Sequence, residues 1–267
     1  MSAGLVGSTL RSLTRALSRA LMSEHTARQR GLMQALDPRV RVIGMLALVI
    51  AAALAHNITV VLFLLLAAIV LALTSAVATR TLALRVWTPV LAFTGIIALP
   101  ALFLTPGVAV SASSPITRQG LYTAVMLIAR VETAVTLTTV LVLTTPWTHM
   151  LKALRALYIP KEAVMMLAMA HRYIFLLAET ARQMFESRES RRVGVLRGAE
   201  QRRLVAQTSG VLMSKSLDLS QDAFLAMQSR GYRGEVHVLS DLAMCAGDYV
   251  ALFVFLGVAV LAIWLGR

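Results

Sequence analysis

Apolar positions gather into five long runs that are separated by short polar or charged segments. The runs cover residues 40–56, 58–78, 86–105, 120–145 and 247–266. Each run is close to the roughly 20 residues that a helix needs to cross a hydrocarbon core of about 30 Å. The runs are continuous and lack the alternation of a barrel strand. The pattern predicts an all-α polytopic membrane protein with about five transmembrane helices.

A long polar segment, residues 146–246, separates the fourth and fifth predicted spans. Its helical patterns cover residues 148–158, 160–192, about 200–216, and a short stretch that starts at Asp218 or Ser220. The short helix is expected to end at Gly231, because glycine readily adopts the left-handed conformation that often terminates a helix. We therefore predict a helical region outside the membrane between the fourth and fifth spans.

The N-terminal part of the chain has a helical pattern of its own. Residues 5–22 place leucines on one face and arginines on the other, which favours a helix on the anionic inner leaflet over an organellar targeting peptide. The pattern is equally compatible with a loosely ordered tail. In the first span, Asp37 is expected to cap the helix and Arg39 and Arg41 to lie at the membrane interface. The expected divisions of the chain are residues 1–35, 36–145, 146–246 and 247–267.

Composition and charge support this topology. The chain is 58% hydrophobic with a mean hydropathy of +0.74, and its net charge is +13. Seven arginines precede residue 42, and fourteen Lys or Arg side chains lie within residues 146–246. The positive-inside rule predicts that the N-terminus and the 79–85 and 146–246 segments are cytoplasmic, and that the C-terminus is outside. No nucleic-acid partner is expected, because no aromatic platform accompanies the basic residues.

Catalytic and metal-binding motifs are not recognisable in the sequence. It contains no P-loop, nucleophile elbow or HExxH motif, and its five histidines are scattered. Cys245 is the single cysteine, so an internal disulfide and a multi-cysteine metal site are excluded. We expect no enzymatic activity, no cofactor and no bound metal in this chain.

Two charged residues, Arg130 and Glu132, interrupt the fourth apolar run. Charges at that depth should face protein or water rather than lipid. Residues two positions apart on a helix point in different directions, so each should have a separate partner. The pair is compatible with polar packing within this chain, and also with a contact to another subunit or a substrate path.

Two similar tripeptides lie in the polar segment, Ser187-Arg188-Glu189 and Ser229-Arg230-Gly231. Each places an arginine near the end of a predicted helix. The five donors of a guanidinium form a rigid fork that matches carboxylates or backbone carbonyls. The arginines are therefore either binding elements for another protein or simple basic anchors beside the membrane.

A set of four segments gives the sequence a family resemblance. In order they are LDPRVRV (residues 36–42), HRYIFLL (171–177), Ser187-Arg188 and AMQSRGYRGE (226–235). Together they resemble the transmembrane T component of energy-coupling factor (ECF) importers, in the CbiQ-like branch. The resemblance implies partners: two ABC-type ATPase subunits, which dock on Arg188 and Arg230, and a separate substrate-binding membrane subunit, the S component. It also implies cobalt or nickel as the transported ion.

Other functions remain open at this stage. The chain is also compatible with the T component of a vitamin-type ECF importer. A stand-alone channel or carrier would use Arg130 and Glu132 along its path, and a membrane scaffold would only bind a peripheral enzyme. These alternatives differ in whether the chain alone moves a solute across a membrane.

Overall fold

The computed structural model describes residues 31–75, 82–105, 117–191, 198–232 and 244–266. All elements within these ranges are helical, which confirms the predicted all-α class. The chain divides into two compact units: one contains α9 and α10, and the other contains the remaining helices. The helix predicted over residues 5–22 lies outside the described residues.

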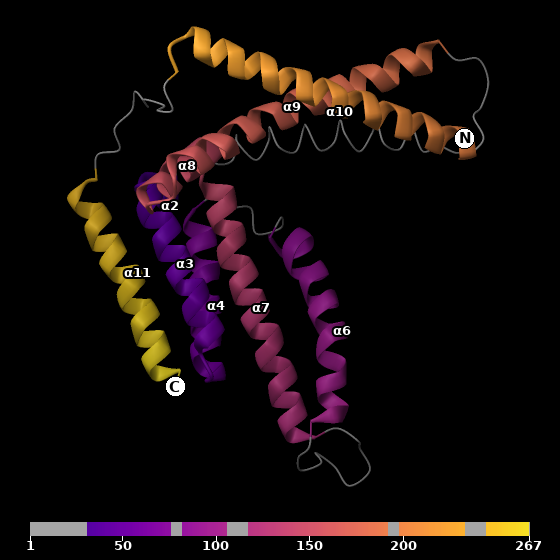
Figure 1. Ribbon diagram of the computed structural model, residues 1–267. Coiled ribbons are helices and arrows are strands. Elements are labelled where there is room, and N and C mark those ends of the chain that lie inside the picture. Colours follow the sequence, from indigo (N-terminus) through magenta and orange to yellow (C-terminus); the bar gives the residue numbers. More distant parts are fainter. Residues whose placement is uncertain (1–30, 76–81, 106–116, 192–197, 233–243, 267) are drawn as a thin grey trace. The chain divides into compact units, whose positions relative to one another are not determined.

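The larger unit is a helical bundle (Figure 1). Its helices are α2 (Leu32–Ala35), α3 (Pro38–Leu54), α4 (Ile58–Thr74), η1 (Ala83–Trp87), α6 (Thr88–Leu104), α7 (Arg118–Thr144), α8 (Trp147–Ala156) and α11 (Ala246–Leu265). The first, second, fourth and fifth predicted spans correspond to α3, α4, α7 and α11. The third corresponds to η1 followed by α6, so this span opens with a π-helical segment.

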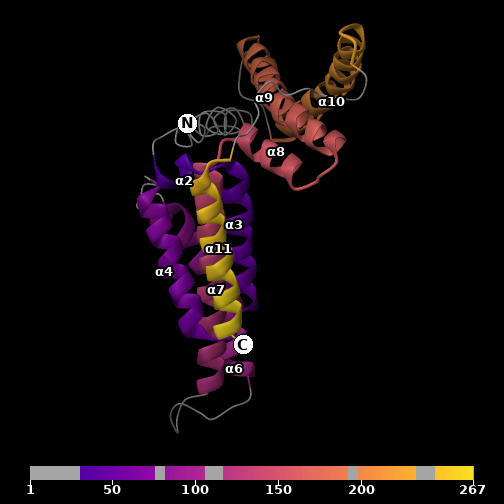
Figure 2. The same cartoon turned by 90° about the vertical axis from the view of Figure 1, so that its left-hand side faces the viewer.

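Helix α7 lies at the centre of the bundle and packs on α3, α4 and α6 (Figures 1 and 2). Its buried side is made of small and branched residues such as Ala129, Thr133 and Val140. By contrast, large apolar side chains on the outer helices are exposed: Phe93 by 68% and Trp264 by 77%. An apolar periphery of this extent suits contact with lipid rather than water.

Helices α3 and α11 lie side by side and run parallel. At their N-terminal ends the backbone N–H of Asp37 donates to the Asp248 carboxylate over 2.8 Å. At their C-terminal ends the N–H of His56 donates to the carbonyl of Gly266, also over 2.8 Å. We refer to these two ends of the bundle as the Asp37 end and the His56 end.

Helix α7 runs in the opposite direction to α3. Its C-terminal residue Thr144 accepts a hydrogen bond from Arg41 near the start of α3, whereas Tyr122 near its N-terminus donates to the carbonyl of His56. The chain therefore leaves the bundle after α7 and α8 at the Asp37 end and re-enters it there at α11. The part of the chain between α8 and α11 is therefore joined to the bundle at the Asp37 end.

Close packing of α3 on α11 depends on Gly44. A Cβ atom at this position would lie 2.6 to 3.0 Å from three atoms of Phe255, which is inside normal van der Waals contact. The absence of a side chain thus allows the aromatic ring to pack directly on the α3 backbone.

The second unit consists of two long helices, α9 (Lys161–Ser190) and α10 (Gly198–Ser229). They cross, with their C-terminal ends on opposite sides of the crossing (Figure 1). The prediction of two separate helices over residues 200–229 is wrong, because α10 is continuous. Ser216 does not break the helix but donates its hydroxyl to the carbonyl of Met213 within it, and Asp218 is exposed to solvent. Side-chain oxygens of this kind suit helix caps but are tolerated on an exposed helical face.

Three helices in the described part are long and apolar enough to cross a membrane: α7, α9 and α11. Two shorter apolar helices, Ile58–Thr74 and Thr88–Leu102, accompany them. Helix α9 differs from α7 and α11 because no residue of its most apolar stretch is fully buried. The structure thus contains several membrane-spanning helices, as the multi-pass prediction requires.

Candidate functional site

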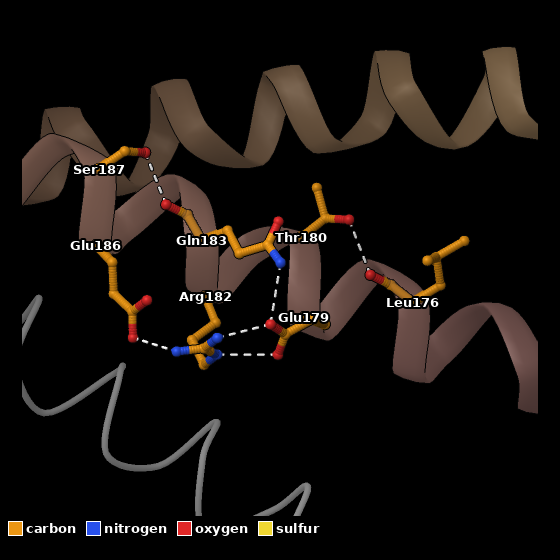
Figure 3. A network of polar contacts seen from close by, with 7 residues as sticks. All are labelled: Leu176, Glu179, Thr180, Arg182, Gln183, Glu186 and Ser187. Atoms are coloured by element: carbon orange, nitrogen blue, oxygen red, sulfur yellow. Dashed lines mark hydrogen bonds and ion pairs between the residues drawn. The ribbon is translucent and has the colours of Figure 1, made fainter.

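The first arginine element lies at the C-terminal end of α9, and Figure 3 shows its first residue, Ser187. Ser187 donates its hydroxyl to the carbonyl of Gln183 over 2.7 Å, which keeps its side chain against the helix. Ser187 and Glu189 are exposed, and Arg188 is half-buried. Among the described residues, no side chain forms a hydrogen bond or ion pair with Arg188. Its guanidinium is thus available to a partner.

A ladder of charged side chains precedes this element on α9 (Figure 3). Arg182 donates to both oxygens of Glu179, over 2.9 and 2.6 Å, and also to Glu186. The hydrogen bond from Arg182 lowers the pKa of Glu179. Because the ionised form is the one that is bonded, this stabilisation is present above the ordinary Glu pKa and is lost as the pH falls through the lowered value. The ladder stiffens the turns of α9 that lead to Arg188.

The second arginine element ends α10 in a defined cap. Gly231 has a φ of 79°, so it occupies the left-handed region that was predicted for it. Its N–H donates to the carbonyl of Gln228, and the N–H of Tyr232 donates to that of Met227. These two bonds form a Schellman motif, which fixes Arg230 as the last residue before the chain turns away from the helix.

Arg230 itself is exposed, as are Ser229 and Gly231. No side chain in the described part of the chain pairs with Arg230. The adjacent Tyr232 donates its hydroxyl to the sulfur of Met165 on α9, over 3.0 Å. The end of α10 is therefore bonded to the beginning of α9. The guanidinium of Arg230 forms no hydrogen bond or ion pair with a described side chain.

The two arginine elements occupy separate places on the crossed helices. Arg188 lies at the end of α9 and Arg230 at the end of α10, on opposite sides of the crossing (Figure 1). The structure thus does not combine them into one site. It presents two separate basic points on one pair of long helices.

Arg130 and Glu132 do not pair with each other, in keeping with their spacing on α7. The Arg130 guanidinium donates to the carbonyl of Ala55 over 2.6 Å, at the hairpin between α3 and α4. The Glu132 side chain is buried at 6% exposure, and neither of its oxygens has a hydrogen-bond partner among the described residues. No group of three His, Cys, Asp or Glu side chains able to hold a metal ion exists in the described ranges.

A buried polar cluster at the Asp37 end was not predicted from the sequence. Arg41 was expected at the membrane interface, but it is 4% exposed and lies inside the bundle. It donates to the carbonyls of Leu36 over 2.6 and 2.9 Å, of Thr144 over 2.8 Å and of Gln34 over 3.3 Å. One guanidinium thus joins the segment before α3 to the end of α7.

Two carboxylates complete this cluster. Asp37 caps α3 by accepting from the N–H of Arg39 over 2.8 Å, as predicted. Asp248 caps α11 by accepting from the N–H of Cys245, and its other oxygen accepts from the N–H of Asp37. The spacing of Cys245 and Asp248 indicates a capping box. The hydrogen bond between Asp248 and Asp37 joins residues 211 positions apart, and a single sequence does not predict it.

Comparison with known proteins decides the family. Residues 29–238 match the CbiQ family, described as cobalt transport protein. The chain belongs to the CbiQ cobalt transport protein family. The resemblance seen in the sequence is thereby confirmed. Membership makes the chain a component of a membrane transport system, which agrees with its several apolar helices.

Two relatives show how far the similarity to other proteins extends. An uncharacterized protein of Methanocaldococcus jannaschii is 30% identical over 243 residues, which cover 88% of this chain and 83% of that protein. The cobalt transport protein CbiQ of Rhodobacter capsulatus is 28% identical over 170 residues, which cover 61% of this chain and 69% of that protein.

Proposed function

We propose that this CbiQ family member is the coupling subunit of an ECF-type importer for cobalt or nickel. In this proposal the chain transmits the movement of two partner ATPases to a separate substrate-binding membrane subunit, and itself catalyses nothing. The observation that carries the proposal is the exposed Arg230, held by a Schellman motif at the end of α10. Arg188 supplies a second such point at the end of α9.

Two separated arginines fit two separate ATPase subunits. Each guanidinium lies at a helix end and has no intramolecular side-chain partner among the described residues, so a carboxylate or carbonyl of a partner can bind it without competition. A 30-residue helix such as α9 is about 45 Å long. A displacement at its Arg188 end is therefore carried as a rigid movement along the helix.

The remaining surface of α9 and α10 suits a second kind of partner. Large apolar side chains are exposed along both helices, including Met166 by 70%, Ile174 by 63% and Leu225 by 61%. Exposed apolar patches of this kind mark interaction sites. We assign them to contact with the substrate-binding subunit or with the membrane surface.

In this proposal α9 lies outside the hydrocarbon core despite its length. Arg172 and His171 lie within its apolar part, and an arginine at the centre of a spanning helix costs about 2.5 to 3.5 kcal/mol. The charged ladder from Glu179 to Glu186 follows directly. The Asp37 end of the bundle, with its basic residues, is then cytoplasmic, and the His56 end faces outward.

The decisive test is charge reversal at Arg230 in the complete complex. Arg230→Glu should abolish co-purification of the ATPase subunits and reduce ATP-dependent uptake of cobalt to background, because the new carboxylate would repel the carboxylate or carbonyl oxygens that bind the guanidinium. Arg202→Glu, on an exposed position of the same helix, is the matched control and should retain both. Normal assembly and uptake in Arg230→Glu would reject the coupling role.

Reconstitution separates this function from the alternatives. The chain alone in liposomes should move no Co²⁺, and uptake should require the ATPases, ATP and the substrate-binding subunit together. Transport by the chain alone would instead support a channel that uses Arg130 and Glu132. Uptake of a vitamin rather than Co²⁺ or Ni²⁺ by the full complex would place the chain in a vitamin-type importer.

A further inference from the structure

The Glu132 carboxyl is the least satisfied polar group inside the bundle. It lies near the middle of α7, is 6% exposed, and both of its oxygens are inaccessible to solvent and have no hydrogen-bond donor among the described residues. Other buried acids differ in this respect, because Asp37 and Asp248 each accept backbone N–H groups. Among the described residues, nothing around Glu132 thus stabilises a negative charge.

The described cations on the helices that pack on α7 do not supply a counter-charge. Helices α4 and α6 contain no titratable residue at all. The arginines of α3 are Arg39 and Arg41, at its first turns, and Arg41 is bonded to Thr144. Thr144 lies about 18 Å beyond Glu132 along α7. These side chains belong to the Asp37 end.

On α7 itself, Arg130 is the nearest cation along the chain. Its guanidinium donates to the carbonyl of Ala55 and makes no hydrogen bond with Glu132. Arg118 lies at the far end of the helix, in its first turn. The remaining neighbour of α7, η1, carries Arg85, whose side chain lies outside the described part. No described cation is within ion-pair distance of Glu132.

An ionised carboxylate in this position would be very costly. The effective penalty for burying an unpaired ion is several kcal/mol, even after relaxation. A buried group normally avoids this cost by neutralising. A divalent metal would need further ligands, and the described residues offer no group of three metal-binding side chains. The proton is the ligand that a single buried carboxylate can bind alone.

We propose that Glu132 is a proton-binding site of the bundle and is a neutral carboxylic acid when the helices are packed. Thr136, one turn further along the same face of α7, accepts a hydrogen bond from the indole of Trp87 over 3.0 Å. This side of α7 thus faces η1, the π-helical start of the third span. Such π-helical turns occur frequently at functional sites.

The test is infrared spectroscopy of the full chain in lipid nanodiscs at pH 7. Exposed carboxyls are ionised at this pH, so a carbonyl stretching band of protonated carboxyl should come from Glu132. This band should vanish completely in Glu132→Gln. Glu179→Gln is the control, because Glu179 is bonded to Arg182 as a carboxylate, and the band should remain there unchanged.

A stability measurement complements the spectrum. Gln is the neutral isostere of a protonated Glu, so Glu132→Gln should retain the wild-type melting temperature. If Glu132 were instead ionised and paired with a cation, the substitution would leave that cation without its counter-ion and the melting temperature would fall. If the variant fails to fold, the wild-type band is followed alone and should persist to about pH 8, well above the ordinary Glu pKa of about 4.3. An ionised Glu132 paired with Arg85 would give no such band at pH 7, and this result would overturn the proposal.

Discussion

Arg41 shows how much structure one buried side chain can fix. Its guanidinium donates to three backbone carbonyls, those of Gln34, Leu36 and Thr144. These carbonyls lie beyond the regular helical hydrogen bonds and would otherwise be buried without donors. The fork geometry of arginine allows one side chain to satisfy them all, which a point-charge ammonium does less well.

We expect Arg41→Ala to destabilise the bundle by about 3 kcal/mol or more, since each carbonyl left without a donor costs about 1 to 3 kcal/mol. Thermal unfolding of the purified chain in detergent measures the loss. Arg41→Lys should recover part of it. Arg39→Ala is the control, because the side chain of Arg39 makes no hydrogen bond to these carbonyls. An unchanged melting temperature in Arg41→Ala would show that the hydrogen bonds from Arg41 to these carbonyls do not stabilise the bundle.

At the residue scale, the sequence predicts local roles better than distant ones. The cap at Asp37 and the left-handed Gly231 were both correct, because each depends on residues a few positions away. The burial of Arg41 was missed, since its partner Thr144 is 103 residues away and contributes only a backbone carbonyl. Any residue has such a carbonyl, so the sequence carries no sign of the contact.

At the scale of elements, α3 and α11 form a closely packed helix pair. Gly44 allows Phe255 to reach the α3 backbone, and hydrogen bonds join the two helices at both ends. Packing of this kind stabilises helices in lipid, where the hydrophobic effect does not drive one helix against another.

Gly44→Leu should force α3 and α11 apart and destabilise the bundle by roughly 1 to 3 kcal/mol or more, as overpacked cores generally do. Thermal unfolding or protease sensitivity in detergent reports this effect. The matched control is Gly95→Leu on α6, where a new side chain meets nothing within 4 Å. Equal effects of the two substitutions would argue against the close contact.

The long helices show where patterns succeed and fail at this scale. The apolar runs predicted the bundle helices, because length and hydropathy are properties of a contiguous stretch. The division of residues 200–229 into two helices was wrong. Serine and aspartate at residues 214–222 were interpreted as caps, but their side chains lie on exposed turns of α10. Pattern alone cannot distinguish a cap from a solvated polar position within a helix.

At the scale of the whole molecule, the topology brings the chain out of the bundle and back into it at one end. Helix α7 ends and α11 begins at the Asp37 end, so the segment with both arginine elements is attached there by two connections. The positive-inside rule predicts that this end is cytoplasmic, which is the side on which the proposed ATPase partners would bind. The proposed function is therefore possible only if the Asp37 end lies on the cytoplasmic side of the membrane.

Cys245 provides a direct test of this topology, because it is exposed at the Asp37 end and is the single cysteine of the chain. A membrane-impermeant maleimide should fail to label it in intact cells and should label it after permeabilisation. In a Cys245→Ser background, His56→Cys at the opposite end should be labelled from outside. Labelling of Cys245 in intact cells would invert the topology and exclude cytoplasmic ATPases as partners of Arg188 and Arg230.

The pairing of α3 with α11 also has a consequence for biosynthesis. The cap of α11 accepts a hydrogen bond from Asp37, a residue 211 positions earlier, and Phe255 covers the groove at Gly44. When α3 emerges from the ribosome, its partner has not yet been translated. Until α11 is made, the first span therefore remains in the translocon or in lipid. During this time the Asp37 N–H lacks its acceptor Asp248, and the α3 backbone at Gly44 is not covered by Phe255. The bundle closes only when α11 inserts, so premature termination leaves an open assembly that quality-control proteases can recognise.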